Sequence, residues 1–192
     1  MVAATQRFTL AEYLAYDDGS DRRYELVNGE LVEMPAESDL NNAIAMYLIG
    51  VIIQILPVLL LRRGTEVVVS GGRATVRVPD LVVLSEELSA ALAGADRSIV
   101  MMDMPPPLLA VEIVSPGKDN QDRDYRYKRS EYGARGILEY WIIDTMQAQV
   151  TILSLVDGFY EESSFQGEDR LISQVFPTLE LTAKQVLQAG MM

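Results

Sequence analysis

The sequence contains no histidine and no cysteine among its 192 residues. Without histidine a Ser-His-Asp triad cannot form, and without cysteine there are no thiol nucleophiles and no disulfides. Zinc sites built from either residue, thiolate-bound iron-sulfur clusters and haem held by either residue are also excluded. A catalyst made from this sequence must use Asp, Glu, Lys, Arg, Tyr, Ser or Thr. Any metal it binds would be a hard cation with oxygen ligands, such as Mg²⁺, Mn²⁺ or Ca²⁺.

Positive charge is also scarce. Lys and Arg number 16 against 28 Asp and Glu, which leaves a net charge of −12. Tight non-specific binding of polyanions by the surface as a whole is therefore not expected. The basic residues nevertheless cluster, so a local basic patch remains open. The clusters are Arg22 with Arg23, Arg62 with Arg63, Arg73 with Arg77, and the segment from Arg123 to Arg135.

One long run lacks charge. Residues 43–61 contain no charged side chain and are followed by Arg62 and Arg63, which imitates a transmembrane segment with a basic flank. Gln54 and Pro57 interrupt the run, so we favour a central helix buried on most sides and expect no membrane association. A membrane-anchored protein stays the alternative. In the favoured helix Ile44, Leu48, Val51 and Ile55 point inward, and Asn42 and Gln54 face water.

The first residues contain no apolar core of signal-peptide length and carry acidic residues early, so no export is expected. The lack of cysteine is compatible with a reducing compartment. A cytoplasmic location is the expectation.

The remaining pattern mixes strands and helices. Thr9 and Glu12 have capping-box spacing, and Asn28-Gly29 between two alternating runs is a strong hairpin signal. Residues 1–192 are therefore expected to form a single α/β domain with a mixed sheet. Helices are predicted over 10–16, from Ser38 to about Pro57, and over 86–93, 122–132 and 182–187. Strands are predicted over 66–70, 73–78, 81–85, 108–114 and 137–144, followed by a hairpin of 149–155 and 159–165.

Two carboxylates stand where the chain otherwise carries apolar residues. Glu112 lies inside the apolar run LLAVEIV, and an ionised carboxylate in that setting costs several kcal/mol unless it has a partner. Asp80 opens the candidate strand LVVL directly after Pro79. If these strands are adjacent, both carboxylates converge at one end of the sheet. Such a pair is a minimal oxygen site for Mg²⁺, which keeps waters and takes few protein carboxylates.

Lys128 is the third candidate. On a helix, Asp124, Lys128 and Tyr132 have i, i+4, i+8 spacing and share a face. This helix follows Glu112 closely in sequence, so it can present the ammonium over the carboxylate. A lysine there can orient an attacking water or stabilise charge on a phosphate. Taken alone, each of these residues also has an ordinary structural explanation, and Tyr132 and Trp141 are expected to be core residues.

The combined pattern resembles the Uma-two family of the PD-(D/E)XK nuclease superfamily, over roughly residues 8–187. The motifs that carry the resemblance are RYELVNGELVEMP at 23–35, VPD at 78–80, VEIVSP at 111–116, the set Asp124, Lys128 and Tyr132, and EYWIID at 139–144. The resemblance implies a restriction endonuclease-like core with a mixed central sheet flanked by helices and with N- and C-terminal hairpins. It also implies hydrolysis of phosphodiester bonds with Mg²⁺, or with Mn²⁺, and Asp80 and Glu112 as metal ligands.

Two positions depart from the family pattern. The superfamily lysine usually follows the acidic residue by two positions, where this chain has Val114, so the resemblance implies that Lys128 takes over its role. The family tends to carry a histidine where this chain has Asn41, and the role of that position is open. Glu25 matches an acidic position of the family's hairpin and is expected to complete the metal site.

These observations predict a metal-dependent nuclease that acts on nucleic acid, with DNA as the expected substrate. Many folds of this kind cleave both strands as dimers, so a homodimer is expected. The rival hypothesis is a non-catalytic binding or regulatory module, in which the carboxylates and Lys128 form a structural ion-pair cluster. The acidic net charge favours this rival.

Overall fold

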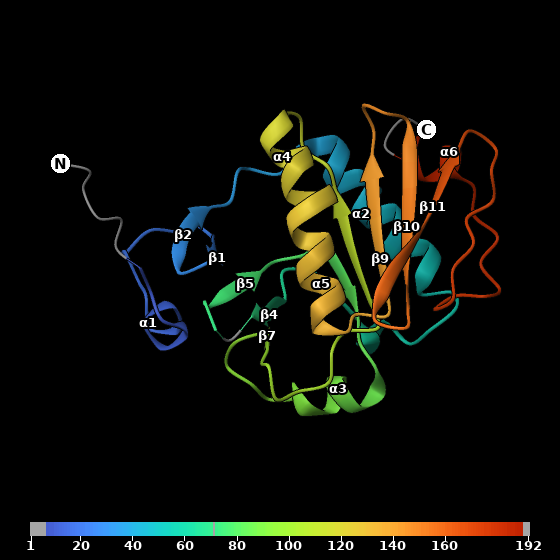
Figure 1. Cartoon of the computed structure of the whole chain (residues 1–192). Helices are drawn as coiled ribbons and strands as arrows, with labels where there is room; N and C mark the ends of the chain where they lie inside the picture. The colour runs from blue at the N-terminus through green and yellow to red at the C-terminus, as the bar shows by residue number, and fades with distance from the viewer. Residues whose placement is uncertain (1–6, 71, 190–192) are drawn as a thin grey trace.

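The computed structural model describes residues 7–70 and 72–189 (Figure 1). Residues 1–6 and 190–192 of the predicted domain, and Gly71, lie outside the described residues. Within the described part the strands form two sheets, and each contains one parallel pair.

The smaller sheet contains the predicted N-terminal hairpin. Asn28 and Gly29 both have positive φ, at 51° and 85°, as a tight hairpin turn between right-twisted strands requires. The sequence did not reveal that residues 66–77 join this sheet rather than the other one. The strand order is β2 (Glu30–Glu33), β1 (Tyr24–Val27), β5 (Thr75–Arg77), β4 (Glu66–Ser70) and β7 (Ile99–Val100), with β4 and β7 parallel.

The larger sheet is the mixed central sheet that was predicted, and the C-terminal hairpin forms one of its ends. Asp157 and Gly158 turn the hairpin with φ of 49° and 85°. The strand order is β11 (Phe159–Gln166), β10 (Gln149–Val156), β9 (Glu139–Asp144), β8 (Leu109–Ile113), β6 (Leu81–Val83) and β3 (Leu61–Arg62), with β8 and β9 parallel.

Helices begin at residues that cap them. Thr9 and Thr182 form capping boxes for α1 (Leu10–Leu14) and α6 (Ala183–Leu187). Ser38 and Ser85 cap α2 (Asp39–Ile52) and α3 (Glu86–Ala91) with their side-chain oxygens.

The helix predicted over 122–132 is longer than expected. It runs without a break through α4 (Lys118–Asp122), the π-helical segment η2 (Arg123–Lys128) and α5 (Arg129–Arg135). Gly133 does not end it, because the chain turns into the left-handed conformation only at Gly136, with φ of 85°. A glycine ends a helix where the backbone needs positive φ, and the sequence pattern placed that point three residues too early.

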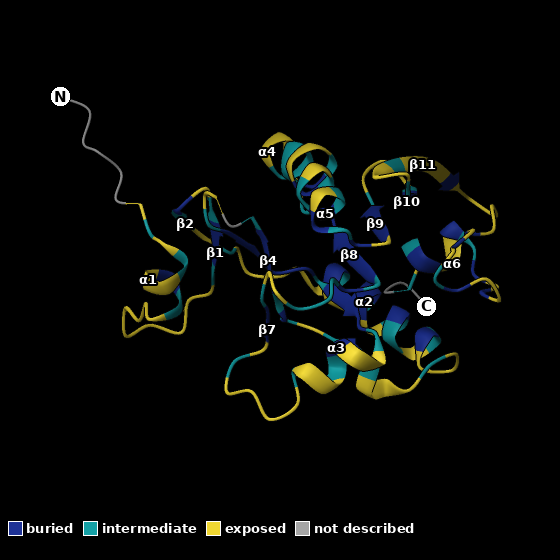
Figure 2. Cartoon of the chain, turned by 60° about the horizontal axis from the view of Figure 1, so that its bottom comes forward, coloured by how far each residue is buried: buried dark blue, intermediate teal, exposed yellow. Residues whose placement is uncertain are grey.

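The larger sheet lies between helices on both faces, as Figures 1 and 2 show. Along β8, Leu109, Val111 and Ile113 pack toward α2 and α6, in a core that also holds Trp141. Ala110 and Val114 pack with Tyr132 and Tyr140 on the opposite face, under α5. Because strand residues alternate, Glu112 shares this second face, as the sequence predicted.

The uncharged run of 43–61 does not continue as one helix. Ile44 and Leu48 are fully buried, but α2 ends at Ile52, ahead of Pro57, and a short 3₁₀ turn, η1 (Val58–Leu60), follows. The prediction that Ile55 points inward is wrong: its side chain is 41% exposed, because helical spacing stops before it. Among the described residues, none of the helices combines the length and apolar character that a bilayer crossing requires.

Candidate active site

Asp80 directly precedes β6, which pairs with the strand β8 that contains Glu112, so the two strands are adjacent as predicted. Strand β6 pairs antiparallel with β8, and the Asp80 N–H donates to the Val111 carbonyl at 3.1 Å. The Ile113 N–H in turn donates to Asp80 Oδ2 at 2.7 Å. Asp80 is therefore fixed by the backbone on both sides of Glu112.

Lys128 reaches Glu112 from the helix above the sheet. Its Nζ lies 2.8 Å from Glu112 Oε2, and the Tyr132 hydroxyl donates to Glu112 Oε1 at 2.7 Å. Asp124 Oδ1 lies 3.6 Å from the same ammonium. Asp124, Lys128 and Tyr132 are all buried, which confirms the shared helix face.

The π-helical segment η2 carries both Asp124 and Lys128. A π-turn inserts an extra residue into a helix and changes which side chains face the neighbouring sheet, and such turns occur frequently at functional sites. Here it leads directly into α5, whose Tyr132 meets the second oxygen of Glu112. Lys118, the alternative donor in the loop after Glu112, begins α4, is 80% exposed and pairs with Asp122.

Glu25 enters from the smaller sheet and lies 3.4 Å from Lys128 Nζ through its Oε1. The Val78 N–H also donates to Oε1, at 3.1 Å, and Arg77 Nη1 lies 2.8 Å from Oε2. Arg77 in addition binds both carboxylate oxygens of Glu131 on α5, at 2.7 and 2.9 Å. Both Glu25 oxygens thus contact a cation or a backbone N–H, so Glu25 links Lys128 to Arg77.

The buried charges shift one another. Burial raises the pKa of Glu112 to about 8, although Lys128 opposes this, since Asp124, Asp80 and Glu25 add negative charge around it. Burial also raises the pKa of Asp80. For Glu25 the cost of burial is outweighed by Lys128 and Arg77, which lower its pKa to about 2.

The pKa of Lys128 is raised despite its burial, because Glu112, Glu25 and Asp124 surround the ammonium. We therefore take Lys128 to be charged at neutral pH. Burial is the main reason that the pKa of Glu112 is high, and the negative charges of Asp124, Asp80 and Glu25 add to it.

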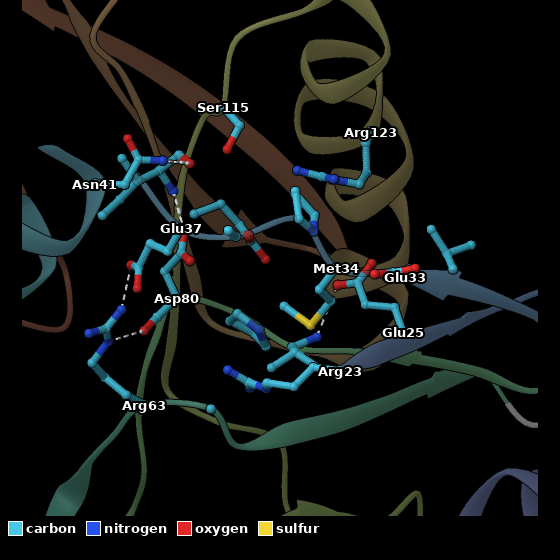
Figure 3. Close-up of a pocket in the computed structure, with 18 of the residues that line it drawn as sticks. Arg23, Glu25, Glu33, Met34, Glu37, Asn41, Arg63, Asp80, Ser115 and Arg123 are labelled. Carbon is cyan, nitrogen blue, oxygen red and sulfur yellow. Dashed lines mark hydrogen bonds and ion pairs between the residues drawn. The ribbon is translucent and has the colours of Figure 1, made fainter. Parts of the chain in front are cut away.

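The cluster opens into a cavity of about 590 Å³ between the two sheets (Figure 3). Asp80, Glu112 and Lys128 line it, together with Ser115 and Arg123, whose side chain is 25% exposed. Figure 3 shows Asp80 with Arg63 on one side of the cavity, and Glu25 with Arg123 on another. The lining carries both acidic and basic side chains.

Asn41, the open position of the family pattern, also lines this cavity and is buried. It lies in the first turn of α2 and donates through Nδ2 to the Ile113 carbonyl at 3.2 Å. The backbone of Ile113 therefore contacts Asp80 through its N–H and Asn41 through its carbonyl. Asn41 fixes the end of β8 where both candidate ligands meet.

The donor set suits a hard divalent cation. In residues 7–70 and 72–189, no group of three or more acidic side chains has the arrangement of a metal site. Asp80 and Glu112 are nevertheless two carboxylates at one cavity, both with raised pKa. Mg²⁺ is commonly held by one or two carboxylates while it keeps its waters. The residues present fit such an ion.

Comparisons with known proteins concern the family and the fold. A sequence model of the family described as "Uma2: Putative restriction endonuclease" matches residues 10–184. The fold is similar to the crystal structure of "a putative nuclease belonging to DUF820" from Anabaena variabilis, with a TM-score of 0.74 over 96% of this chain and 99% of that one. The two sequences are 17% identical, so this likeness concerns the fold, and it confirms the predicted fold class. No curated protein matches the chain.

Proposed function

Because the chain belongs to the Uma2 family, as its sequence motifs predicted, we propose that it is a nuclease that uses a divalent metal ion to hydrolyse phosphodiester bonds of DNA. The observation that carries the proposal is the meeting of Asp80, Glu112 and Lys128 at one cavity. Lys128 Nζ lies 2.8 Å from Glu112, and the backbone next to Glu112 binds Asp80.

Asp80 and Glu112 are the residues that would hold Mg²⁺, or Mn²⁺ in its place. When bound, such an ion polarises the phosphate and lowers the pKa of the attacking water. Glu25, first expected as a third ligand, has the different role of holding Lys128 in this proposal. In the net reaction, the oxygen of water attacks phosphorus, the bond to the opposite oxygen breaks, and a phosphate monoester and a hydroxyl group form.

Lys128 acts on the substrate through its charge. Since three carboxylates keep it protonated, it does not serve as a general base. Its ammonium can orient the water by hydrogen bonding or stabilise the charge that develops on the phosphate. Tyr132 holds Glu112 in position and Asp124 holds Lys128, so Tyr132 and Asp124 affect the reaction only indirectly.

The rival function is a non-catalytic module. The observation that favours it is the completeness of the ion-pair cluster, because Lys128 already has three carboxylates within 3.6 Å. A cluster that is satisfied internally has no need for a cation. Metal binding therefore separates the two functions before any substrate is known.

The proposal keeps DNA as the substrate, a homodimer as the acting form and the cytoplasm as the location. The family description supports the choice of DNA, since restriction endonucleases act on it. Val58 and Leu59 of η1 support a dimer, because they expose 61% and 68% of their surface and would gain from a covering partner. Sedimentation of the purified chain tests the dimer.

The decisive experiment compares wild type with Asp80→Asn on supercoiled DNA, linear duplex, single-stranded DNA and RNA, each with Mg²⁺, Mn²⁺ or EDTA. The proposal expects cleavage by wild type with a divalent ion, none in EDTA and none by Asp80→Asn. If wild type binds the ion but cleaves no nucleic acid, or if it neither binds nor cleaves, the nuclease proposal fails. Cleavage of RNA alone would refute the choice of DNA.

A further inference from the structure

The basic residues on the cavity wall differ in whether they already form an ion pair with a carboxylate. Besides Lys128, the wall contains Arg22, Arg23, Arg63 and Arg123. Arg22 lies 3.4 Å from Glu33, Arg63 pairs with Glu37, and Arg123 lies 3.0 Å from Asp124. Each of these three would have to share or give up a carboxylate in order to bind an anion.

Arg23 is different. Arg23 is exposed, and among residues 7–70 and 72–189 no carboxylate lies within ion-pair distance of its guanidinium group. The group lies against Gly64, where a Cβ atom would be 3.1 Å from Arg23 Nη2. Gly64 also has φ of 69°, so glycine provides both the turn and the space for this side chain.

A second cavity of about 240 Å³ adjoins the first. Arg22, Arg23, Gly64 and Val78 line both cavities, so Arg23 lies where they meet. Tyr16, 37% exposed, also lines the second cavity. Figure 3 shows Arg23 and Arg123 on different sides of the first cavity.

We propose that Arg23 binds a phosphate of the nucleic-acid strand where the strand passes from the Asp80–Glu112 site toward the second cavity. This inference rests on the proposed nuclease function. A chain with a net charge of −12 repels a polyanion at long range, so it needs local cations at the site. A guanidinium group without a carboxylate partner binds a phosphate through two parallel hydrogen bonds and gives up no existing ion pair.

The test measures how DNA binding depends on salt. The full chain is titrated in EDTA, which prevents metal-dependent cleavage, against a fluorescein-labelled oligonucleotide in single-stranded and duplex form. Salt is varied over about 50 to 200 mM. The variants are Arg23→Gln, Arg23→Lys and the control Arg73→Gln. Arg73 is exposed, lines neither cavity, and carries the same charge, so its replacement changes the net charge equally.

Loss of one phosphate contact reduces the slope of log K against log salt by about 0.9 on duplex and about 0.7 on a single strand. Arg23→Gln is expected to show this reduction and to weaken binding equally for all sequences. Arg23→Lys should retain most of the slope, and Arg73→Gln should match wild type. Melting temperatures confirm that each variant is folded.

The outcomes separate the two proposals. If wild type binds DNA and Arg23→Gln keeps the full slope, or if Arg73→Gln loses as much, Arg23 is not a phosphate contact and the nuclease proposal stands. If wild type binds neither oligonucleotide form in EDTA, the Arg23 proposal falls, and the cleavage assay with Mg²⁺ or Mn²⁺ decides the nuclease proposal. A titration with inorganic phosphate identifies a free-anion site: binding that depends on Arg23, with an unchanged oligonucleotide slope, would overturn the strand assignment.

Discussion

Lys128 Nζ lies 2.8 Å from Glu112 Oε2, and at most 4% of either side chain is exposed to solvent. The ammonium group comes from the helix and the carboxylate from the middle of the central sheet. A buried ammonium group is costly without oxygen partners, so Lys128 depends on Glu112 for one of its contacts. The pair thus fastens the η2 segment to β8 and at the same time sets the geometry of the candidate site.

Replacing Lys128 by Met should cost stability as well as activity. The substitution leaves Glu112, Glu25 and Asp124 without their shared ammonium, and the loss of one partner from a buried pair typically costs about 3 to 5 kcal/mol. Cleavage should fall by about 10² to 10³, the loss expected for one charge-stabilising group. Urea denaturation and a cleavage assay measure the two effects.

Two further variants make the Lys128 prediction specific. Lys118→Met removes an exposed lysine and should change stability by less than about 0.5 kcal/mol and leave cleavage intact. The Lys128→Met, Glu112→Gln double variant removes both partners of the 2.8 Å contact, so it should be more stable than the sum of its single variants predicts. Strict additivity would mean that the two charges do not interact. Loss of cleavage in Lys118→Met would show that the active-site lysine is misassigned.

Asp80→Asn tests the metal site. Millimolar Mg²⁺ or Mn²⁺ should raise the melting temperature of wild type, with a gain of about 2.7 kcal/mol when the ion is at 100 times its Kd. The variant should lose this gain, while its metal-free melting temperature should not fall, because the neutral amide oxygen still accepts the Ile113 N–H and no charge is buried. Asp21→Asn removes an exposed carboxylate from the same wall and is the control. Equal metal binding by wild type and Asp80→Asn would refute the assignment.

Glu25→Gln distinguishes a metal ligand from a residue that holds cations. If Glu25 holds Lys128 and Arg77, the variant should lose about 3 to 5 kcal/mol of stability and still bind the ion. If Glu25 is a ligand, metal binding should weaken in calorimetry and stability should change little. The second result would restore the ligand role expected from the sequence.

The site could be predicted largely because local patterns determine it. Alternation along β8 placed Glu112 on the face under α5, and helical spacing placed Lys128 and Tyr132 together. The VPD motif brought Asp80 to the start of the neighbouring strand. In each case a spacing of two or four residues was enough to decide which side chains share a face.

The parts that failed depend on contacts distant in sequence. Arg77 is a charged residue in an apolar strand, the same signal that identified Glu112, but nothing local shows that Glu25 and Glu131 are its partners. The π-turn of η2 has no sequence signature, and the division into two sheets depends on which strands pair. Local spacing placed Glu112 and Asp124 near Lys128, but the 3.4 Å approach of Glu25 from the smaller sheet depends on contacts distant in sequence.

The pH dependence of stability should reveal Glu112. Burial raises its pKa from 4.5 to about 8, so the folded chain holds a proton that the unfolded chain has lost. The stability that this proton contributes is fully present below pH 4.5 and disappears as pH rises through about 8. Glu25, with its pKa lowered to about 2, acts oppositely and only in acid, where its contribution to stability is lost as pH falls below about 4.5.

Without metal, the melting temperature should therefore fall as the pH rises from 6 to 8. Since the ion binds the ionised form, the gain produced by Mg²⁺ should be larger at pH 8 than at pH 6. Glu112→Gln has no proton to lose, so its metal-free melting temperature should change less over this window. If the melting temperature of Glu112→Gln depends on pH as that of wild type does, a carboxylate other than Glu112 causes the pH dependence.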